Sequence, residues 1–270
     1  MPLITAEDYT HFPDAPPDQT YPYGNDPNQF GDLYLPPSSD TPHPVIILVH
    51  GGCYRAQYDL KPLGNICKAL VAEGFAVWNI EYRRMGNGGD YPNMFLDVAQ
   101  SADYLRQIAD THQLNLDQVI TVGHSAGGHI ALWLAGRHKI PKSSDLYLAN
   151  PLPIKGVVVL AGMVDAVHAI KHGICEGGLA VMMGGEPDTV PENYHVADPR
   201  ALLPIGIPQT HIIGEHDTEM MENFESYNTV AEQTGDPITL IVPPDAGHFE
   251  IVDVSSKAWQ TVRDAVIKIW

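Results

Sequence analysis

Residues 119–128, with the sequence VITVGHSAGG, constrain this chain more than any other stretch. A β-branched run leads into Gly-x-Ser-x-Gly, and a helix-like segment over residues 126–137 follows. Strand, sharp turn and helix in this order raise a serine hydroxyl above the end of a sheet. Small residues at Gly123 and Gly127 suit such a turn, because the strand and helix backbones approach each other closely there. The helix also directs its first N–H groups toward developing negative charge. We therefore predict that Ser125 is a nucleophile.

Short apolar runs alternate with helical patterns along most of the chain. Strands are expected over residues 30–35, 45–49, 75–80, 119–122, 157–160, 209–213 and 238–242, and helices over 60–72, 93–109, 126–137, 220–233 and 255–270. The uninterrupted apolar run 45–49 is typical of a strand that is covered on both faces, whereas 30–35 alternates like an edge strand. Such alternation predicts an α/β fold, with a mostly parallel central sheet flanked by helices.

Two segments do not follow this alternation. Residues 1–29 are rich in Pro, Asp and Tyr and have no clear period, so we expect an N-terminal arm on the domain. Residues 163–207 contain several glycines and prolines and no strong strand, which suits a small cap or lid insertion over the strand ends. Ordinary helix and connecting loop is an equally good interpretation of that segment. The length of 270 residues fits a single domain spanning 1–270.

Composition restricts the classes of binding partner and the cellular location that we expect. With 15 Lys and Arg against 33 Asp and Glu, the formal net charge is -18, which argues against nucleic acid or an anionic membrane as partner. The cysteines, Cys53, Cys67 and Cys175, are odd in number and widely spaced, so we expect neither a disulfide framework nor a zinc site. The N-terminus resembles no signal peptide, and no apolar run reaches the length of a membrane span. We expect a cytoplasmic protein, and leave open whether it is a monomer or a homodimer.

A serine needs a base, and the base needs an acid. His248 lies in a Gly-containing loop after the last predicted strand, and Asp217 follows the strand before it. This gives the order Ser, acid, His that the strand–turn–helix motif uses. Asp217 is preferred to Glu215, which follows its strand so closely that it is expected to face away. Asp245 and Asp165 are the alternative acids, the former as a turn residue close to His248 and the latter after the 157–160 strand. The carboxylate would hold the imidazole tautomer.

The sequence HGGCY directly follows the 45–49 strand. Small residues there allow backbone N–H groups to face a cavity, so those of Gly52 and Cys53, with that of Ala126, are candidates for an oxyanion hole. A tight connecting turn is the simpler interpretation, but the position after a buried strand and before the serine motif favours the functional one. His50 is expected to brace this loop rather than to transfer protons.

Other side chains are candidates for substrate contacts. Tyr54 and Tyr58 are expected at the mouth of the pocket, although exposed loop tyrosines are equally plausible. His124 precedes the predicted nucleophile and is expected either to contact substrate or, like His129, to pack and form hydrogen bonds.

Several residues suggest chemistry that we do not predict. Glu81 and Arg83 are expected to form a structural ion pair that braces the loops. His168 and His172 stand four apart, as helical metal ligands can, but no third ligand is evident, so no metal is expected. The GNGG sequence at 86–89 lacks the lysine and helix of a phosphate-binding loop. We expect no cofactor.

The motifs HGG, GHSAGG, GEHD and AGHF, in this order, resemble the α/β-hydrolase superfamily. The EYRR sequence at 81–84 makes the chain more similar to the HGG-bearing esterases, lipases and kynurenine-formamidase-like enzymes. The resemblance runs from about residue 30 to the C-terminus. It implies an eight-stranded, mostly parallel sheet and metal-free hydrolysis through an acyl-serine. The chain departs from the pattern at Cys53, where many relatives have Gly, Ala or Phe, and at Tyr54, where Trp is usual. These changes leave the shape of the acyl pocket open.

Three hypotheses follow. The first is a serine esterase that cleaves carboxylic esters with short acyl groups, with Ser125, His248 and Asp217 as the triad. The second keeps this machinery and cleaves an amide such as the formyl group of N-formylkynurenine. The third is a non-catalytic ligand-binding protein on the same fold, because fold does not fix function. The expected partner of the first two is a small-molecule ester or amide.

Overall fold

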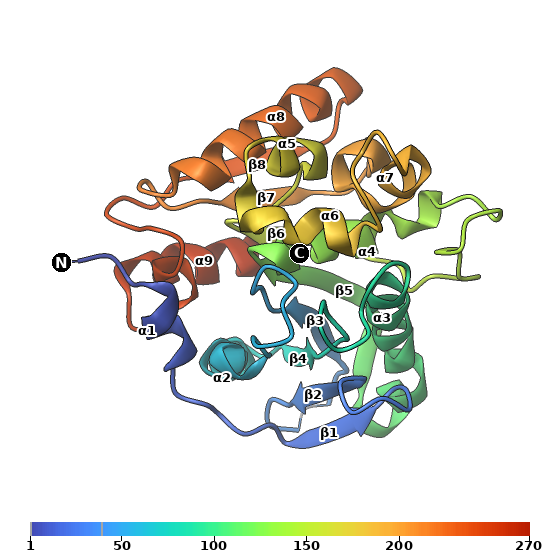
Figure 1. Ribbon diagram of the computed structural model, residues 1–270. Helices are drawn as coiled ribbons and strands as arrows, with labels where there is room; N and C mark the ends of the chain where they lie inside the picture. Colours follow the sequence, from blue (N-terminus) through green and yellow to red (C-terminus); the bar gives the residue numbers. More distant parts are fainter. Residues whose placement is uncertain (1, 39) are drawn as a thin grey trace.

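The computed structural model describes residues 2–38 and 40–270 of the chain. Its centre is an eight-stranded sheet in the order β1-β2-β4-β3-β5-β6-β7-β8 (Figure 1). Strands β3 to β8 run parallel to their neighbours, and only β1–β2 and β2–β4 pair antiparallel. The predicted mostly parallel α/β sheet is therefore confirmed. The strand bounds are β1 (Gln19–Pro22), β2 (Phe30–Tyr34), β3 (His43–Val49), β4 (Ala76–Ile80), β5 (Leu114–His124), β6 (Gly156–Leu160), β7 (Gln209–Ile212) and β8 (Ile238–Ile241).

Helices cover both faces of this sheet. In Figure 1, α2 and α9 lie on one face, and α3 and α4 lie on the other. Among the residues described, no helix is both long and apolar enough to cross a membrane. The α-helices are α1 (Ala6–Thr10), α2 (Gly64–Val71), α3 (Asn93–His112), α4 (Ala126–Gly136), α5 (Ala166–Lys171), α6 (Gly178–Met182), α7 (Pro191–Ala197), α8 (Thr218–Thr234) and α9 (Lys257–Lys268), and the 3-10 turns are η1 (Lys61–Leu63), η2 (Arg137–Lys139), η3 (Ile174–Gly177), η4 (Pro199–Leu202) and η5 (Glu250–Val252).

The core lies between the central strands and the two helix layers. The apolar run in β3 is fully buried, and every residue of α4 is buried as well. Trp78 on β4 and Trp133 on α4 are the largest of the fully buried side chains. Their indole nitrogens each donate a hydrogen bond, to Ser101 O at 3.1 Å and to Val196 O at 3.0 Å. The strands on either side of β5, β3 and β6, are buried along nearly their whole length. The C-terminal end of β5 is therefore a place where a side chain can leave the core.

The N-terminal segment, in which the sequence shows no clear period, contains a helix and a strand. Residues 19–22 form the edge strand β1, and β2 is therefore the second strand of the sheet rather than its edge. Four residues containing a proline are too short for a two-residue period to be recognised in the sequence. Before β1, Thr5 caps α1 and accepts a hydrogen bond from Asp8 N.

Residues 163–207, all of which the structure describes, contain helices and turns and no strand. Figure 1 draws them in yellow to orange. They follow β6 in the chain and carry α5, η3, α6, α7 and η4 before β7 begins. This agrees with the absence of a strand pattern in the sequence. We refer to these residues below as the 163–207 segment, and its predicted role as a cap stays a prediction.

Candidate active site

Ser125 lies at a sharp turn between β5 and α4. Its φ of 54° and ψ of -122° are unusual for a non-glycine residue, and such conformations persist only where the surroundings impose them. The turn leaves no room for side chains beside it, because a Cβ on Gly123 would lie 2.1 Å from Gly127 O, and one on Gly127 would lie 2.2 Å from Val49 O. These close approaches agree with the strand and helix crowding expected from the motif.

His248 and Asp217 come together from two loops. The Nδ1 atom of His248 lies 2.5 Å from Asp217 Oδ2, and the imidazole is partly exposed whereas the carboxylate is nearly buried. Asp217 is the residue that precedes α8, and its N–H donates to Gly214 O at 2.9 Å. The sequence order Ser, Asp, His thus becomes a spatial grouping, because β5, β7 and β8 end at the same edge of a parallel sheet.

The other acidic candidates have different partners. Glu215 accepts a hydrogen bond from Asp245 N at 3.0 Å, and Asp245 has a φ of 57°, as expected of a turn residue. Asp165 caps α5 through His168 N at 2.9 Å and accepts from Ser226 Oγ at 2.6 Å. Within the described residues, none of these three carboxylates forms a hydrogen bond or ion pair with the His248 ring, so Asp217 is the acid that the geometry favours.

A cavity of about 360 Å³ opens in front of the serine. Ser125, His248, Gly52 and Cys53 all lie on its wall. The expected nucleophile, the expected base and the turn expected to form the oxyanion hole therefore border the same cavity. The remaining wall contains Tyr58 and His124, which were expected at the pocket, and six residues that the sequence did not point to. It is formed by Ala6, Tyr9, Arg55, Tyr58, His124, Cys175, Glu176 and Phe249.

Tyr9 and Phe249 are the functional candidates that the sequence did not reveal. Tyr9 is 5% exposed, and its ring stacks on Phe249 at 5.1 Å between centroids and lies 5.7 Å from the ring of His124. Burial raises the pKa of the Tyr9 hydroxyl well above its usual value. The only available signal was the aromatic residue after His248, and nothing in the pattern of residues 1–29 points to the pocket.

The turn after β3 presents small residues to the cavity, as predicted. Gly52 has a φ of 110°, and a Cβ there would lie 2.4 Å from Tyr58 Cβ, so glycine is required on both counts. Ala126 is the first residue of α4, and its N–H therefore has no partner within the helix. Tyr58 and His124 line the cavity as expected.

The expectation that Tyr54 lines the pocket mouth was wrong. Its side chain is fully buried and is absent from the cavity wall. The hydroxyl lies 2.7 Å from His129 Nδ1, and His129 Nε2 lies 2.7 Å from Ala197 O. Burial lowers the pKa of His129 to about 4, so the ring is neutral near pH 7 and donates to the carbonyl while accepting from the tyrosine. A positive φ of 59° turns Tyr54 inward, which sequence spacing does not reveal.

The expectation of no disulfide was also wrong. Cys53 and Cys175 are joined, with their Cα atoms 5.3 Å apart, and Cys67 is the free cysteine, buried in α2. The two partners stand 122 residues apart in sequence. Residues so far apart in sequence give no sign that they pair. The two side chains meet because the 163–207 segment folds back onto the turn after β3.

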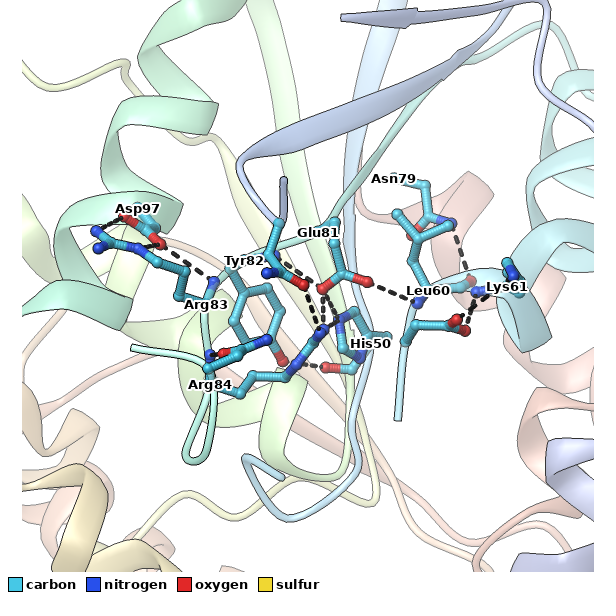
Figure 2. Close-up of polar contacts among 12 residues, drawn as sticks. His50, Leu60, Lys61, Asn79, Glu81, Tyr82, Arg83, Arg84 and Asp97 are labelled. Atoms are coloured by element: carbon cyan, nitrogen blue, oxygen red, sulfur yellow. Dashed lines mark hydrogen bonds and ion pairs between the residues drawn. The ribbon is translucent and has the colours of Figure 1, made fainter. Parts of the chain in front are cut away.

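Figure 2 shows the buried side chains that brace the turn after β3. The carboxylate of Glu81 lies 3.1 Å from His50 Nε2 and also contacts Arg84 Nη1. The Tyr82 hydroxyl donates to His50 O at 2.8 Å. Burial lowers the pKa of His50 to about 3, so this ring stays neutral near pH 7. A bracing role for His50 fits this arrangement.

Glu81 and Arg83 do not pair with each other, contrary to the expected ion pair. Arg83 instead forms a bidentate contact with Asp97, through Nε at 2.8 Å and Nη2 at 2.7 Å (Figure 2). Glu81 contacts the buried His50 and Arg84, whereas Arg83 reaches Asp97 on α3, so each side chain has its own partner. Both nevertheless serve as structural ion pairs.

His124 joins the two halves of the site. Its Nε2 donates to His248 O at 2.9 Å, and the two rings lie 4.8 Å apart. Burial, with a smaller contribution from the charge of His248, lowers the pKa of His124 to about 3. The ring is therefore neutral under ordinary conditions, so its role near His248 is one of hydrogen bonding and packing.

Two groups of residues have metal-ligand chemistry. The rings of His168 and His172 stack with their centroids 4.1 Å apart. Elsewhere in the described residues, ligand atoms of Glu215, His216 and Asp245 lie within 4.8 Å of one another, but all three side chains are exposed. Exposed acidic clusters are common on proteins, and nothing else at either place points to an ion.

Comparison with known proteins places this site in context. A "Probable isoprenylcysteine alpha-carbonyl methylesterase" of Arabidopsis thaliana is 26% identical over 217 residues, which is 76% of this chain and 51% of that protein. The match thus spans about half the length of the plant protein. The kynurenine formamidase of Salmo salar is 22% identical over 236 residues, covering 86% of this chain and 74% of that protein.

Solved structures show the same fold. Esterase B from Lactobacillus Rhamnosis superposes with a TM-score of 0.79 at 18% identity, over 95% of this chain and 87% of that one. A truncated carbohydrate esterase from gut microbiota gives 0.75 at 21% identity, over 94% and 98%. These neighbours establish the α/β-hydrolase fold. The BD-FAE family model matches residues 31–228, from β2 through most of α8. This chain therefore belongs to the BD-FAE family, within the α/β-hydrolase superfamily.

Proposed function

We propose that this protein is a serine esterase that hydrolyses carboxylic esters with short acyl groups. The observation that carries the proposal is one cavity wall holding Ser125 at its sharp turn and His248, whose Nδ1 lies 2.5 Å from Asp217 Oδ2. A serine hydroxyl is a weak nucleophile until an adjacent imidazole takes its proton. An imidazole does so when a carboxylate fixes its tautomer.

Acylation follows from these positions. Nε2 of His248 accepts the Ser125 hydroxyl proton while Oγ attacks the ester carbonyl carbon. The N–H groups of Gly52, Cys53 and Ala126 donate to the oxygen as it becomes negative, and Asp217 stabilises the imidazolium through Nδ1–H. His248 then returns the proton to the alkoxide oxygen as the carbon–oxygen bond breaks. The alcohol leaves, and the acyl group stays on Ser125.

Deacylation repeats the steps with water in place of serine. His248 takes a proton from water, the hydroxide attacks the acyl carbonyl, and the same donors hold the oxyanion. Collapse releases the carboxylic acid and returns the proton to Ser125 Oγ. Every proton in the cycle passes through one nitrogen of His248, so the reaction needs no metal-bound water.

Short acyl groups are supported by the cavity. Its 360 Å³ must hold both acyl and alcohol parts of a substrate, and the disulfide side of the wall is covalently closed. The plant relative is named a methylesterase, which supports a small-molecule ester as partner. A cytoplasmic location stays a prediction.

Hydrolysis of p-nitrophenyl esters from acetate to octanoate tests the proposal. We expect kcat/KM to fall with chain length, and Ser125→Ala to lower kcat by at least about 10³-fold. Ser255→Ala, at an exposed serine away from the cavity, is the matched control and should retain full activity.

The opposite outcomes are equally informative. Full activity in Ser125→Ala would rule out the proposed nucleophile. Silence on every ester, together with no labelling of the folded protein by a fluorophosphonate, would favour a non-catalytic ligand-binding protein.

Formamide hydrolysis is the second candidate, because the similarity to the kynurenine formamidase of Salmo salar covers 86% of this chain. Ester and formamide share the same first tetrahedral geometry, so the same residues serve both reactions. N-formylkynurenine measured beside the esters decides between them. A kcat/KM on the formamide well above that on acetate would move the assignment to an arylformamidase.

A further inference from the structure

The disulfide links the site to a distant part of the chain. Cys53 belongs to the turn after β3, whereas Cys175 belongs to η3 in the 163–207 segment. Both cysteines line the same cavity as Ser125. Both are only half-buried, so a small thiol in solution can reach them. The link is thus an accessible bond in the wall of the candidate active site.

The backbone around this bond is strained on both sides. Cys53 and Tyr54 have φ values of 49° and 59°, and Cys175 and Glu176 have values of 61° and 51°. Left-handed conformations are unfavourable for residues with a Cβ and persist where the surrounding structure imposes them. Two strained pairs face each other across one covalent bond, so the conformation of each turn depends on its attachment to the other.

Two further contacts hold the same turn. On the buried side, the Tyr54 hydroxyl is fixed by His129 at 2.7 Å. On the solvent side, Arg55 Nη2 pairs with Glu176 Oε2 at 2.7 Å, but the Glu176 side chain is 84% exposed. Exposed ion pairs contribute little. Without the disulfide, Tyr54 would therefore stay anchored, while Gly52 and Cys53 would lose their covalent restraint on the cavity side.

We propose that the Cys53–Cys175 disulfide is a positioning element for the backbone N–H groups of Gly52 and Cys53, and that its reduction by a dithiol lowers turnover reversibly. This inference rests on the proposed function. One thiolate of the dithiol attacks a sulfur of the disulfide and forms a mixed disulfide; its second thiol then closes a cyclic disulfide. Two electrons and two protons pass to the sulfurs of Cys53 and Cys175.

The effect should fall on kcat. Oxyanion donors act on the charge that develops in the transition state and hardly touch the neutral carbonyl of bound substrate. Loss of one donor costs about 10²–10³ in rate. A turn that samples the correct position only part of the time costs less. His124 and Phe249 come from other parts of the wall, so their contribution to the pocket does not depend on the disulfide.

The test compares oxidised protein, dithiothreitol-treated protein and Cys175→Ala on p-nitrophenyl acetate. Cys175→Ala breaks the bond without touching a proposed oxyanion donor. We expect kcat to fall about tenfold in both the reduced protein and the variant, with KM changed less than twofold. Dithiothreitol should have no further effect on the variant, and removal of the reductant in air should restore the wild type.

Cys67→Ala provides the matched control. This cysteine is free and buried, and burial raises the pKa of its thiol well above the usual value. The variant should therefore behave like wild type in both redox states. Titration of accessible thiols must show two more per chain after reduction.

Contrary outcomes are distinct. Reduced protein with two new thiols and unchanged kcat would overturn the inference, and a lower melting temperature without a kcat change would do the same, since it marks a purely structural bond. Slower fluorophosphonate labelling of Ser125 after reduction would support it even where the ester is a poor substrate. Oxidised protein that neither cleaves esters nor takes the label would overturn the proposed function and, with it, this inference.

Discussion

At the scale of single residues, His124 has the most informative surroundings. It stands beside Ser125 in sequence, it is buried, and its Nε2 donates to the backbone carbonyl of His248 at 2.9 Å. Because its pKa is lowered to about 3, the ring carries no charge above about pH 4. His124 thus holds the loop that bears His248 without contributing a proton.

We predict that His124→Phe lowers kcat by about tenfold and leaves the shape of the pH–rate profile unchanged above pH 5. The phenyl ring fills the space but donates no hydrogen bond. His195→Phe, at an exposed histidine, is the control. A displaced pH profile in His124→Phe would instead mean that His124 exchanges protons during turnover.

The glycines of the serine turn lead to a second residue-level prediction. A Cβ on Gly127 would lie 2.2 Å from Val49 O. We expect Gly127→Ala to lower the free energy of unfolding by about 3 kcal/mol or more, since backbone atoms must move. In Gly74→Ala the new Cβ meets nothing within 4 Å, and the positive φ alone should cost about 1 kcal/mol. Urea unfolding of both variants measures the difference, and equal losses would contradict the packing argument.

At the scale of elements, the N-terminal helix α1 belongs to the site. Ala6 and Tyr9 line the cavity, and the Tyr9 ring stacks on Phe249. The segment is attached to the rest of the molecule by Ile4 N, which donates to Glu250 Oε1, and by the stacking of Tyr9 on Phe249. A short helix far from the catalytic motifs in sequence thereby completes the pocket.

We predict that Tyr9→Ala raises KM for p-nitrophenyl acetate at least fivefold while lowering kcat less than about threefold, because Tyr9 shapes the pocket without contacting the oxyanion donors. Leu3→Ala, whose side chain is 42% exposed on the same segment, is the control. A pure kcat effect in Tyr9→Ala would show that the ring positions His248 rather than the substrate.

Elements also show how far the sequence could be interpreted. The apolar runs of β3, β5 and β6 and the turn at Ser125 were predicted with their order, because burial on both faces leaves an unmistakable pattern. β1 was missed, since an edge strand of four residues needs little hydrophobic content. Helix was one of the two interpretations of the 163–207 segment, but α5 to α7 could not be located in it, because each is seven residues or fewer and spans too few turns to display a period.

At the scale of the whole molecule, buried neutral histidines link stability to pH. Burial lowers the pKa of His50, His124 and His211 to about 3 and that of His129 to about 4. Below about pH 6.5 these histidines are protonated in the unfolded chain but stay neutral in the folded protein. The free energy of unfolding therefore falls as the pH drops toward 4. Asp198 acts in the opposite sense, because burial raises its pKa to about 7 and the folded state keeps its proton. The four histidines together outweigh the single aspartate, so the net effect of lowering the pH is destabilising.

We therefore predict that the free energy of unfolding decreases as the pH is lowered from 7 to 4.5, by up to about 1.4 kcal/mol per pH unit for each histidine. His211 packs against Phe224 and Tyr227, away from the catalytic cavity, so His211→Phe should make this decrease shallower. His216→Gln, at an exposed histidine, should leave it unchanged. Equal slopes in wild type and His211→Phe would contradict the linkage.

The residue pattern was sufficient to predict the parallel strands, the serine turn and the chain order of Ser125, Asp217 and His248, because periodicity and closely spaced glycines are visible over short stretches of sequence. Four features could be recognised only in the folded molecule: Asp217 reaches His248, Tyr54 turns inward to His129, α1 lines the cavity, and Cys53 is bonded to Cys175. These contacts join residues dozens to hundreds of positions apart. Their geometry depends on how separate elements pack, which no local pattern encodes.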